Sequence, residues 1–187
     1  MSLFNFFQKK EYSIGIVPGK ETQKMLDKRD DETIYLFLKY LGDSGRFKNS
    51  IELLVHKHRD APFKVVTEGN LLSLDQKKEL KLNSKKKYGD KYIQTLTEIG
   101  LADKASVDFL INSYYQAFWI SSRKFEINKI KKSGITKCRI STCNDERDCE
   151  AIKKYGKKVF NIDDVPELPL AECTSDYCRC MIVAVID

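Results

Sequence analysis

The sequence predicts an α+β protein with a mainly helical N-terminal body and a small cysteine-rich module at its C-terminus. Three observations support this fold class. Apolar residues recur at helical spacing over much of the first 132 positions. After Gly134 the pattern changes to short alternating runs that are typical of strands. All six cysteines follow residue 137. We therefore expect a helical domain over residues 1–133 and a cysteine-rich module over residues 134–187.

The N-terminal half contains a series of expected short elements. Tyr12–Val17 predicts a strand or extended arm, because Pro18 and Gly19 then form a turn. Glu21–Leu41 favours helix, either unbroken or divided near Lys28. The elements expected next are a helical segment at Ser50–His58, an extended piece at Phe63–Val66, and helices at Asp75–Leu82 and Lys86–Ile99.

The clearest helical pattern runs from Asp103 to about Lys132, where apolar side chains keep a helical period and Gly134 supplies a stop. A helix of this length is unusual in a globular protein, so a break near Ser121 and Ser122 is expected. The aromatic side chains of this segment are expected in the core. They are Tyr114, Tyr115, Phe118 and Trp119.

The module after Gly134 is expected to contain a strand at Ile135–Ile140, a short helix at Glu146–Tyr155 and a closing strand at Cys178–Ile186. No apolar run approaches the roughly 18 residues that a membrane span needs. No secretion signal is recognisable either, so we expect a soluble cytoplasmic protein. In a reducing compartment, clustered thiols are metal ligands or buried side chains more often than disulfides.

The spacing of the cysteines favours a metal site. Tetrahedral zinc takes four soft ligands from short converging segments. Cys178 and Cys180 flank one residue of the expected strand, so their thiols would share a face. Cys173 precedes them in a loop, and Cys149 from the short helix could complete the set, with Cys143 as a substitute. Cys138 is expected to be an ordinary strand residue.

Three interpretations of these cysteines stay open: a zinc site, which the pattern favours, a set of packed thiols, and a redox pair or disulfide. Neighbouring cations could stabilise thiolates without a metal. Those cations are Arg179, Lys153 and Lys154.

The stretch from Lys131 to Cys149, the following Gly156–Phe160 and the closing Cys178-Arg-Cys180 together resemble the C-terminal region of phage head-morphogenesis (minor head) proteins. The likeness covers roughly residues 115–185. Two positions depart from that pattern, since Ile152 and Ser175 stand where the family has a cysteine and a histidine. The chain is also similar to a related cysteine module of uncharacterised bacterial proteins. The resemblance implies a phage-derived structural protein with a protein partner.

Lysine clusters suggest nucleic acid as an alternative partner. The net charge is +6, and dense lysines can follow a phosphate backbone. A solvated lysine-rich face is the favoured interpretation, because arginine is sparse and no base-reading motif is visible. The candidate lysines are Lys77, Lys78, Lys85, Lys86, Lys87, Lys131 and Lys132.

A cysteine-thiolate enzyme or redox protein is the third hypothesis. A nucleophilic cysteine needs a base within hydrogen-bond reach. The only histidines, His56 and His58, lie outside the module in sequence and are expected to be surface residues. Phosphate-loop, dinucleotide and zinc-protease motifs are absent from the sequence. The sequence therefore favours a non-enzymatic structural or interaction protein.

Overall fold

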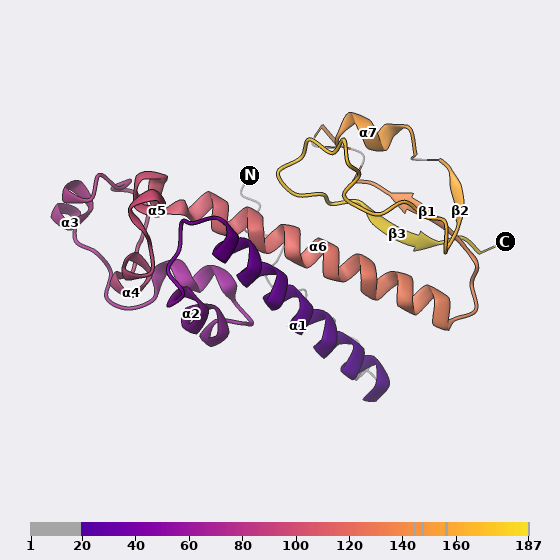
Figure 1. Ribbon diagram of the computed structural model, residues 1–187, viewed down its shortest axis with the longest axis horizontal. Helices are drawn as coiled ribbons and strands as arrows, with labels where there is room; N and C mark the ends of the chain where they lie inside the picture. The colour runs from indigo at the N-terminus through magenta and orange to yellow at the C-terminus, as the bar shows by residue number, and fades with distance from the viewer. Residues whose placement is uncertain (1–19, 144, 147, 156, 187) are drawn as a thin grey trace.

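The computed structural model describes residues 20–143, 145–146, 148–155 and 157–186. The strand expected at Tyr12–Val17 lies outside these residues. The fold is α+β: a helical body is followed by a small three-stranded antiparallel sheet near the C-terminus (Figure 1). This confirms the fold class predicted from the sequence. None of the helices in the described ranges is long and apolar enough to cross a membrane.

Two long helices form the frame of the molecule. Helix α1 (Lys20–Asp43) and helix α6 (Val107–Lys132) lie side by side in opposite directions (Figure 1). Both are unbroken, so the break expected near Ser121 was wrong. The Ser121 hydroxyl lies 2.5 Å from that of Thr33 and 3.1 Å from the Ala117 carbonyl, so it is satisfied without interrupting the helix.

Short elements connect the two long helices. The secondary structure differs from the prediction in two segments. Phe63–Val66 belongs to a 3₁₀ helix, and Lys86–Ile99 is not one helix. The elements are α2 (Ile51–Lys57), η2 (Pro62–Thr67), α3 (Leu74–Glu79), α4 (Asp90–Gln94), α5 (Glu98–Ala102) and η3 (Lys104–Ser106).

Long-range pairing explains why the segment before α4 is not helical. The Gly89 N–H donates to the Val66 carbonyl at 2.9 Å, and the Tyr88 carbonyl accepts from Leu72 at 2.9 Å. A Cβ atom at Gly89 would lie 1.9 Å from the Glu68 carbonyl oxygen, so this approach requires glycine. Helix propensity within the segment is overridden by contacts with residues about 20 positions earlier.

The helical body has its own core. Its largest fully buried side chains include Phe37 and Leu41 of α1 and Tyr88 and Tyr92 from the connecting segments. The Tyr92 hydroxyl donates to the Ala105 carbonyl at 2.6 Å, so the buried phenol is satisfied.

The C-terminal unit has a second core beneath its sheet. Strand β1 (Lys137–Ser141) is central, between β2 (Val159–Asn161) and β3 (Met181–Ala184), and both pairings are antiparallel. A short helix, α7 (Glu150–Lys153), lies between β1 and β2. The core of this unit is formed mainly by Ile140, Ile152 and Ile182, together with Ile130 of α6.

Candidate metal centre

The candidate site forms where three segments of the C-terminal unit meet. Cys149 is the residue immediately before α7, Cys173 lies in the loop that follows β2, and Cys178 and Cys180 lie in the irregular segment that leads into β3. The closing strand begins at Met181, later than predicted. Cys149, Cys178 and Cys180 are buried and Cys173 is half-buried. These four cysteines are the set predicted from the sequence.

The four thiols interact with one another. The Cys173 thiol is hydrogen-bonded to the Cys149 and Cys178 thiols, and the Cys178 thiol is also hydrogen-bonded to that of Cys180. Cys149 and Cys180, at the two ends of this row of hydrogen-bonded thiols, are close enough to interact electrostatically. All four remain free thiols. The fold therefore brings together side chains that are up to 31 positions apart, from 149 to 180.

Arg123 of α6 fixes the backbone of the site. Its side chain is buried, and its two terminal nitrogens donate to three carbonyls: Nη1 to Cys178 at 3.0 Å and to Cys180 at 3.2 Å, and Nη2 to Leu168 at 3.1 Å. A rigid guanidinium with several donors suits this task, because it can hold separate carbonyls at once. The cysteine segment is thus attached to the long helix of the body.

Further polar contacts orient the same segment. The Cys178 N–H donates to Oε1 of Gln116 on α6 at 3.1 Å. The Arg179 side chain forms a bidentate ion pair with Asp145, in which Nη2 donates to Oδ1 at 2.6 Å and Nη1 donates to Oδ2 at 3.0 Å. Its Nη2 also lies 3.5 Å from Oδ1 of Asp148. The segment around Cys178 is therefore held from both sides, by α6 and by the turn that precedes Cys149.

The electrostatics of the cluster favour one thiolate. The hydrogen bond from the Cys180 thiol lowers the pKa of Cys178 to about 6, assisted by the Cys180 N–H, Arg123 and Cys173. The same hydrogen bond, together with burial, raises the pKa of Cys180. Burial also raises the pKa of Cys173. A negative charge is thus best accommodated at Cys178, next to Arg123.

Burial lowers the pKa of Arg123, and the thiolates of Cys178, Cys180 and Cys173 act in the opposite direction. Within the described ranges no carboxylate forms an ion pair with Arg123. A buried cation without a counter-charge is costly. A thiolate at Cys178, whose pKa is lowered, would place a negative charge beside this guanidinium.

The described residues contain no group of three or more His, Cys, Asp or Glu side chains already arranged to hold a metal ion. The four thiols of the cluster are instead hydrogen-bonded to one another in a row, from Cys149 through Cys173 and Cys178 to Cys180. Cys143 is exposed after β1, close to Arg179, and does not join them. Cys138 is fully buried in β1, opposite Phe160 and Ala184, as a strand residue. Burial raises the pKa of its thiol.

The sequence did not point to Arg123 or Gln116. An arginine in the middle of a helix is normally a surface residue. Its role here depends on carbonyls that lie 45 to 57 positions later in the chain. The only local signal is that Gln116 and Arg123 are seven residues apart and so lie on one face of α6.

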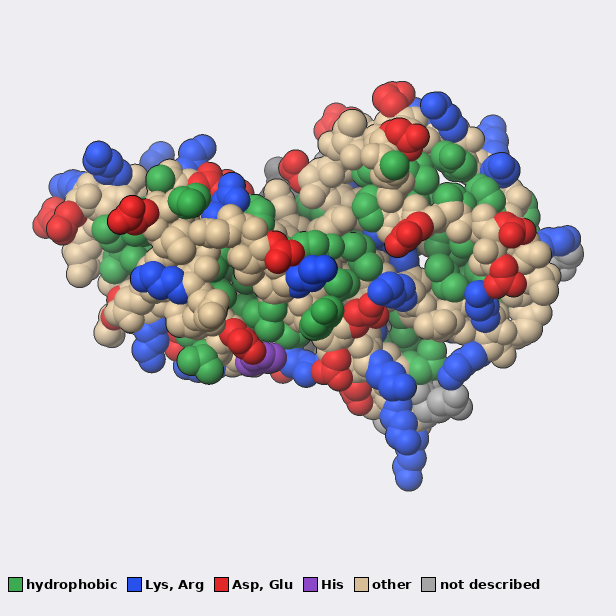
Figure 2. Space-filling model, in the orientation of Figure 1, with side chains coloured by type: hydrophobic (Ala, Val, Ile, Leu, Met, Phe, Trp, Pro, Cys, Tyr) green, Lys and Arg blue, Asp and Glu red, His purple; other side chains and the backbone are tan. Residues whose placement is uncertain are grey.

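Most of the candidate nucleic-acid lysines each contact a different partner within the protein. Lys77 is buried and donates to the Ser84 carbonyl at 3.2 Å. Three others lie near carboxylates: Lys78 with Asp75, Lys86 with Asp108 and Lys131 with Asp163. Lys132 contacts Met25, and Lys85 and Lys87 are exposed. Figure 2 shows acidic side chains interspersed with the basic ones on the visible face. These ion pairs reduce the positive potential of the candidate patches, and nucleic-acid binding stays a prediction.

Both histidines belong to the helical body. His56 is exposed on α2, 3.6 Å from Glu52, and His58 just after α2 lies 2.6 Å from Glu68. Helix α2 lies away from the sheet of the C-terminal unit (Figure 1). Neither histidine is therefore beside the cysteine cluster.

Comparison with protein families, with curated proteins and with solved structures found no match to this chain.

Proposed function

We propose that the protein is a non-enzymatic structural or interaction protein whose C-terminal unit is stabilised by a zinc ion bound to Cys149, Cys173, Cys178 and Cys180. The observation that supports this best is the contact between four thiols from three segments, next to a buried arginine. Zinc in structural sites takes four such ligands in a closed arrangement. The ligands must be thiolates, so the metal would replace the thiol protons of the present hydrogen-bonded chain.

Charge balance supports the same metal. Four thiolates around one Zn²⁺ carry a net charge of about −2, because each thiolate contributes −1. Arg123 lies beside this charge and has no carboxylate partner in the described part of the chain. The buried guanidinium and the anionic centre would therefore stabilise each other.

The C-terminal unit has a small hydrophobic core, so a bound metal would add stability that the core alone does not supply. Its core is small, and several of its buried members are the cysteines themselves. A core of this size contributes little stability alone, whereas binding of a structural zinc contributes directly to folding. Zinc bound by reduced thiols suits a cytoplasmic protein. The positions of His56 and His58 in the body support a non-enzymatic role.

The zinc content of purified protein tests this proposal. We expect one zinc per chain by elemental analysis of the wild type. Cys173→Ser removes a ligand that is only half-buried, so loss of zinc is expected with little direct damage to packing. Cys143→Ser is the matched control and should retain one zinc, because Cys143 is apart from the cluster. Metal-free wild-type protein with a stable C-terminal unit would contradict the proposal.

The resemblance to phage minor head proteins suggests a protein as the partner of this module. A phage origin stays a prediction.

A further inference from the structure

Strand β3 forms a free edge of the sheet. The strand order is β2-β1-β3, so within the described ranges β3 has a partner on one side only. The Val185 N–H donates to the Lys137 carbonyl at 3.0 Å, which makes these two residues a hydrogen-bonded pair. Because hydrogen-bonded and non-bonded pairs alternate in an antiparallel ladder, the backbone groups of Ile182 and Ala184 point away from β1. No other hydrogen bond reaches them from the described residues, so they can pair with a further strand.

This edge lacks the features that normally prevent edge strands from pairing. Charged side chains, proline or a very short strand protect an exposed edge. Strand β3 consists of Met-Ile-Val-Ala and is followed by Val185, without charge or proline. The opposite edge, β2, has only three residues and follows Lys157 and Lys158. We therefore expect the β3 edge to be covered, whereas the β2 edge is protected by its own sequence.

An apolar groove runs along the β3 edge. It has a volume of about 360 Å³ and is lined by all four residues of β3 and by the last turns of α6. Consecutive residues of a strand point to opposite faces, so a groove that all four residues line follows the edge of the strand. The lining from α6 and the residues after it consists of Glu126, Lys129, Ile130, Ser133 and Ile135. Apolar side chains of an added strand would be buried against the two isoleucines.

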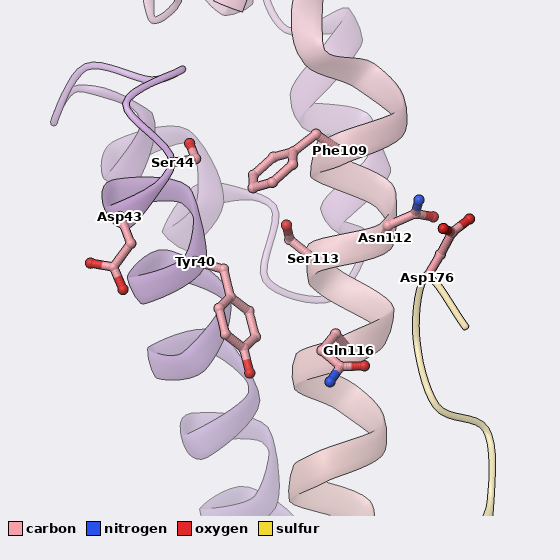
Figure 3. Close-up of a pocket in the computed structure, with 8 residues that line it drawn as sticks. All are labelled: Tyr40, Asp43, Ser44, Phe109, Asn112, Ser113, Gln116 and Asp176. Atoms are coloured by element: carbon pink, nitrogen blue, oxygen red, sulfur yellow. The ribbon is translucent and has the colours of Figure 1, made fainter. Parts of the chain in front are cut away.

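The larger cavity between α1 and α6 is less suited to an apolar segment. Figure 3 shows the carboxylates of Asp43 and Asp176 and the amide of Asn112 around it. Covering these polar groups with apolar side chains would be costly. Its helical walls also offer no free strand edge, because helix backbone groups are bonded within the helix. The groove beside β3 is therefore the better place for an extended apolar segment.

The chain before α1 contains such a segment. Tyr12–Val17 alternates apolar and small residues, which is typical of a strand, and only Pro18 and Gly19 separate it from α1. Figure 1 shows α1 beginning near the end of α6 that carries the sheet. Met25 Sδ of α1 lies 3.6 Å from Nζ of Lys132, the last residue of α6. The three residues from Val17 to the start of α1 span up to about 10 Å, which is about the diameter of a helix.

We propose that Tyr12–Val17 binds in this groove as a fourth strand, paired with β3. Its backbone would bond to the free N–H and carbonyl groups of Ile182 and Ala184. Ile14 and Ile16 would share one face of the strand and lie in the apolar groove. The N-terminal segment would then attach α1 to the C-terminal unit. This contact is separate from the cysteine cluster and does not depend on a metal.

Amide hydrogen exchange of the full chain, followed residue by residue by NMR, tests this pairing. We expect the Ile182 and Ala184 amides of the wild type to be protected. Ile14→Asp places a charge on the apolar face of the added strand and should accelerate exchange at both amides about tenfold or more. Ser13→Asp is the matched control, because Ser13 lies on the opposite face, and it should exchange like the wild type. Circular dichroism checks that both variants are folded.

Protection that Ile14→Asp removes, and that is the same at all protein concentrations, supports the proposal. It is overturned if both amides exchange in the wild type as fast as in an unstructured peptide, or if Ile14→Asp and Ser13→Asp have equal effects. Protection that weakens on a hundredfold dilution would also overturn it, because a second copy of the chain would then cover the edge.

Discussion

Arg123 is the single residue on which the C-terminal unit depends most. Its guanidinium is buried and donates to the carbonyls of Leu168, Cys178 and Cys180. Those acceptors belong to the loop and to the segment that carry the cysteines. The residue therefore determines where that segment lies against α6, and it also provides the positive charge beside the thiols.

Replacing this arginine should be strongly destabilising. Arg123→Met leaves three carbonyls without their donor, and an unsatisfied buried group costs about 1–3 kcal/mol, so we expect the free energy of unfolding to fall by at least about 2–4 kcal/mol. Urea unfolding of both proteins measures this. The adjacent Lys124→Met is the control, because Lys124 is exposed and pairs with Glu32, and it should cost less than about 1 kcal/mol. Equal losses in the two variants would show that Arg123 has no special role.

Glu68 gives the helical body a dependence on acidic pH. Hydrogen bonds from Lys57 at 2.5 Å and from His58 at 2.6 Å lower the pKa of Glu68 to about 2, with the Lys57 contact as the larger cause. In the unfolded chain a glutamate has a pKa of about 4.3. The folded state therefore favours the ionised form. Its stabilising effect is complete above about pH 4.3 and is lost as the pH falls toward 2.

Glu68→Gln should remove this pH-dependent contribution. We expect the variant to be less stable than the wild type at pH 7, with a difference that shrinks between about pH 4.3 and pH 2. Thermal unfolding across this range gives the comparison. Glu79→Gln, at an exposed position of α3, should follow the wild type at every pH. A difference between Glu68→Gln and the wild type that stays constant down to pH 2 would contradict this account.

At the scale of elements, α6 joins the two parts of the fold. One face packs on α1 through small residues such as Ala117 and Ser121, and another contacts the cysteine segment through Gln116 and Arg123. Small side chains let the two long helices approach closely. The length of α6 is thus explained by contacts along both faces, which is why it needs no break.

Overfilling this contact should destabilise the body. Ser121→Leu adds bulk at a position that is 1% exposed, so we expect a loss of about 1–3 kcal/mol in the free energy of unfolding. Asn128→Leu places the same side chain at an exposed position of α6 and should be nearly neutral. Chemical unfolding of both variants tests the packing. A neutral Ser121→Leu would mean that the helices are not closely packed there.

The sequence predicted those elements whose structure is determined locally. The helical periodicity located α6, and the alternating pattern at Ile135–Ile140 located β1 to within two residues. It located α3 but failed at Phe63–Val66 and at Lys86–Ile99, where pairing between distant segments decides the backbone, as at Gly89. The four cysteines could be grouped because thiols are scarce and clustered in the sequence. Arg123 could not be found, because its partners are remote in the chain.

At the scale of the whole molecule, two cores share one helix. The first lies between α1, the connecting segments and the beginning of α6, and the second lies between the end of α6, the sheet and α7. If zinc stabilises the second core, removing it should affect mainly that part. With a chelator, we expect hydrogen exchange to accelerate at Lys137–Ser141 and Met181–Ala184 while the buried turns of α1 stay protected. Uniform acceleration over both cores would contradict a metal that acts locally.

The coordination of the metal is the most direct test of the central claim. X-ray absorption at the zinc edge on the purified wild-type protein reports the ligand atoms and their distances. The account predicts four sulfur ligands at about 2.3 Å, a count that Cys143→Ser leaves unchanged and Cys173→Ser reduces. A zinc with mainly nitrogen or oxygen ligands, or a loss of sulfur ligands in Cys143→Ser, would contradict the proposed set of Cys149, Cys173, Cys178 and Cys180.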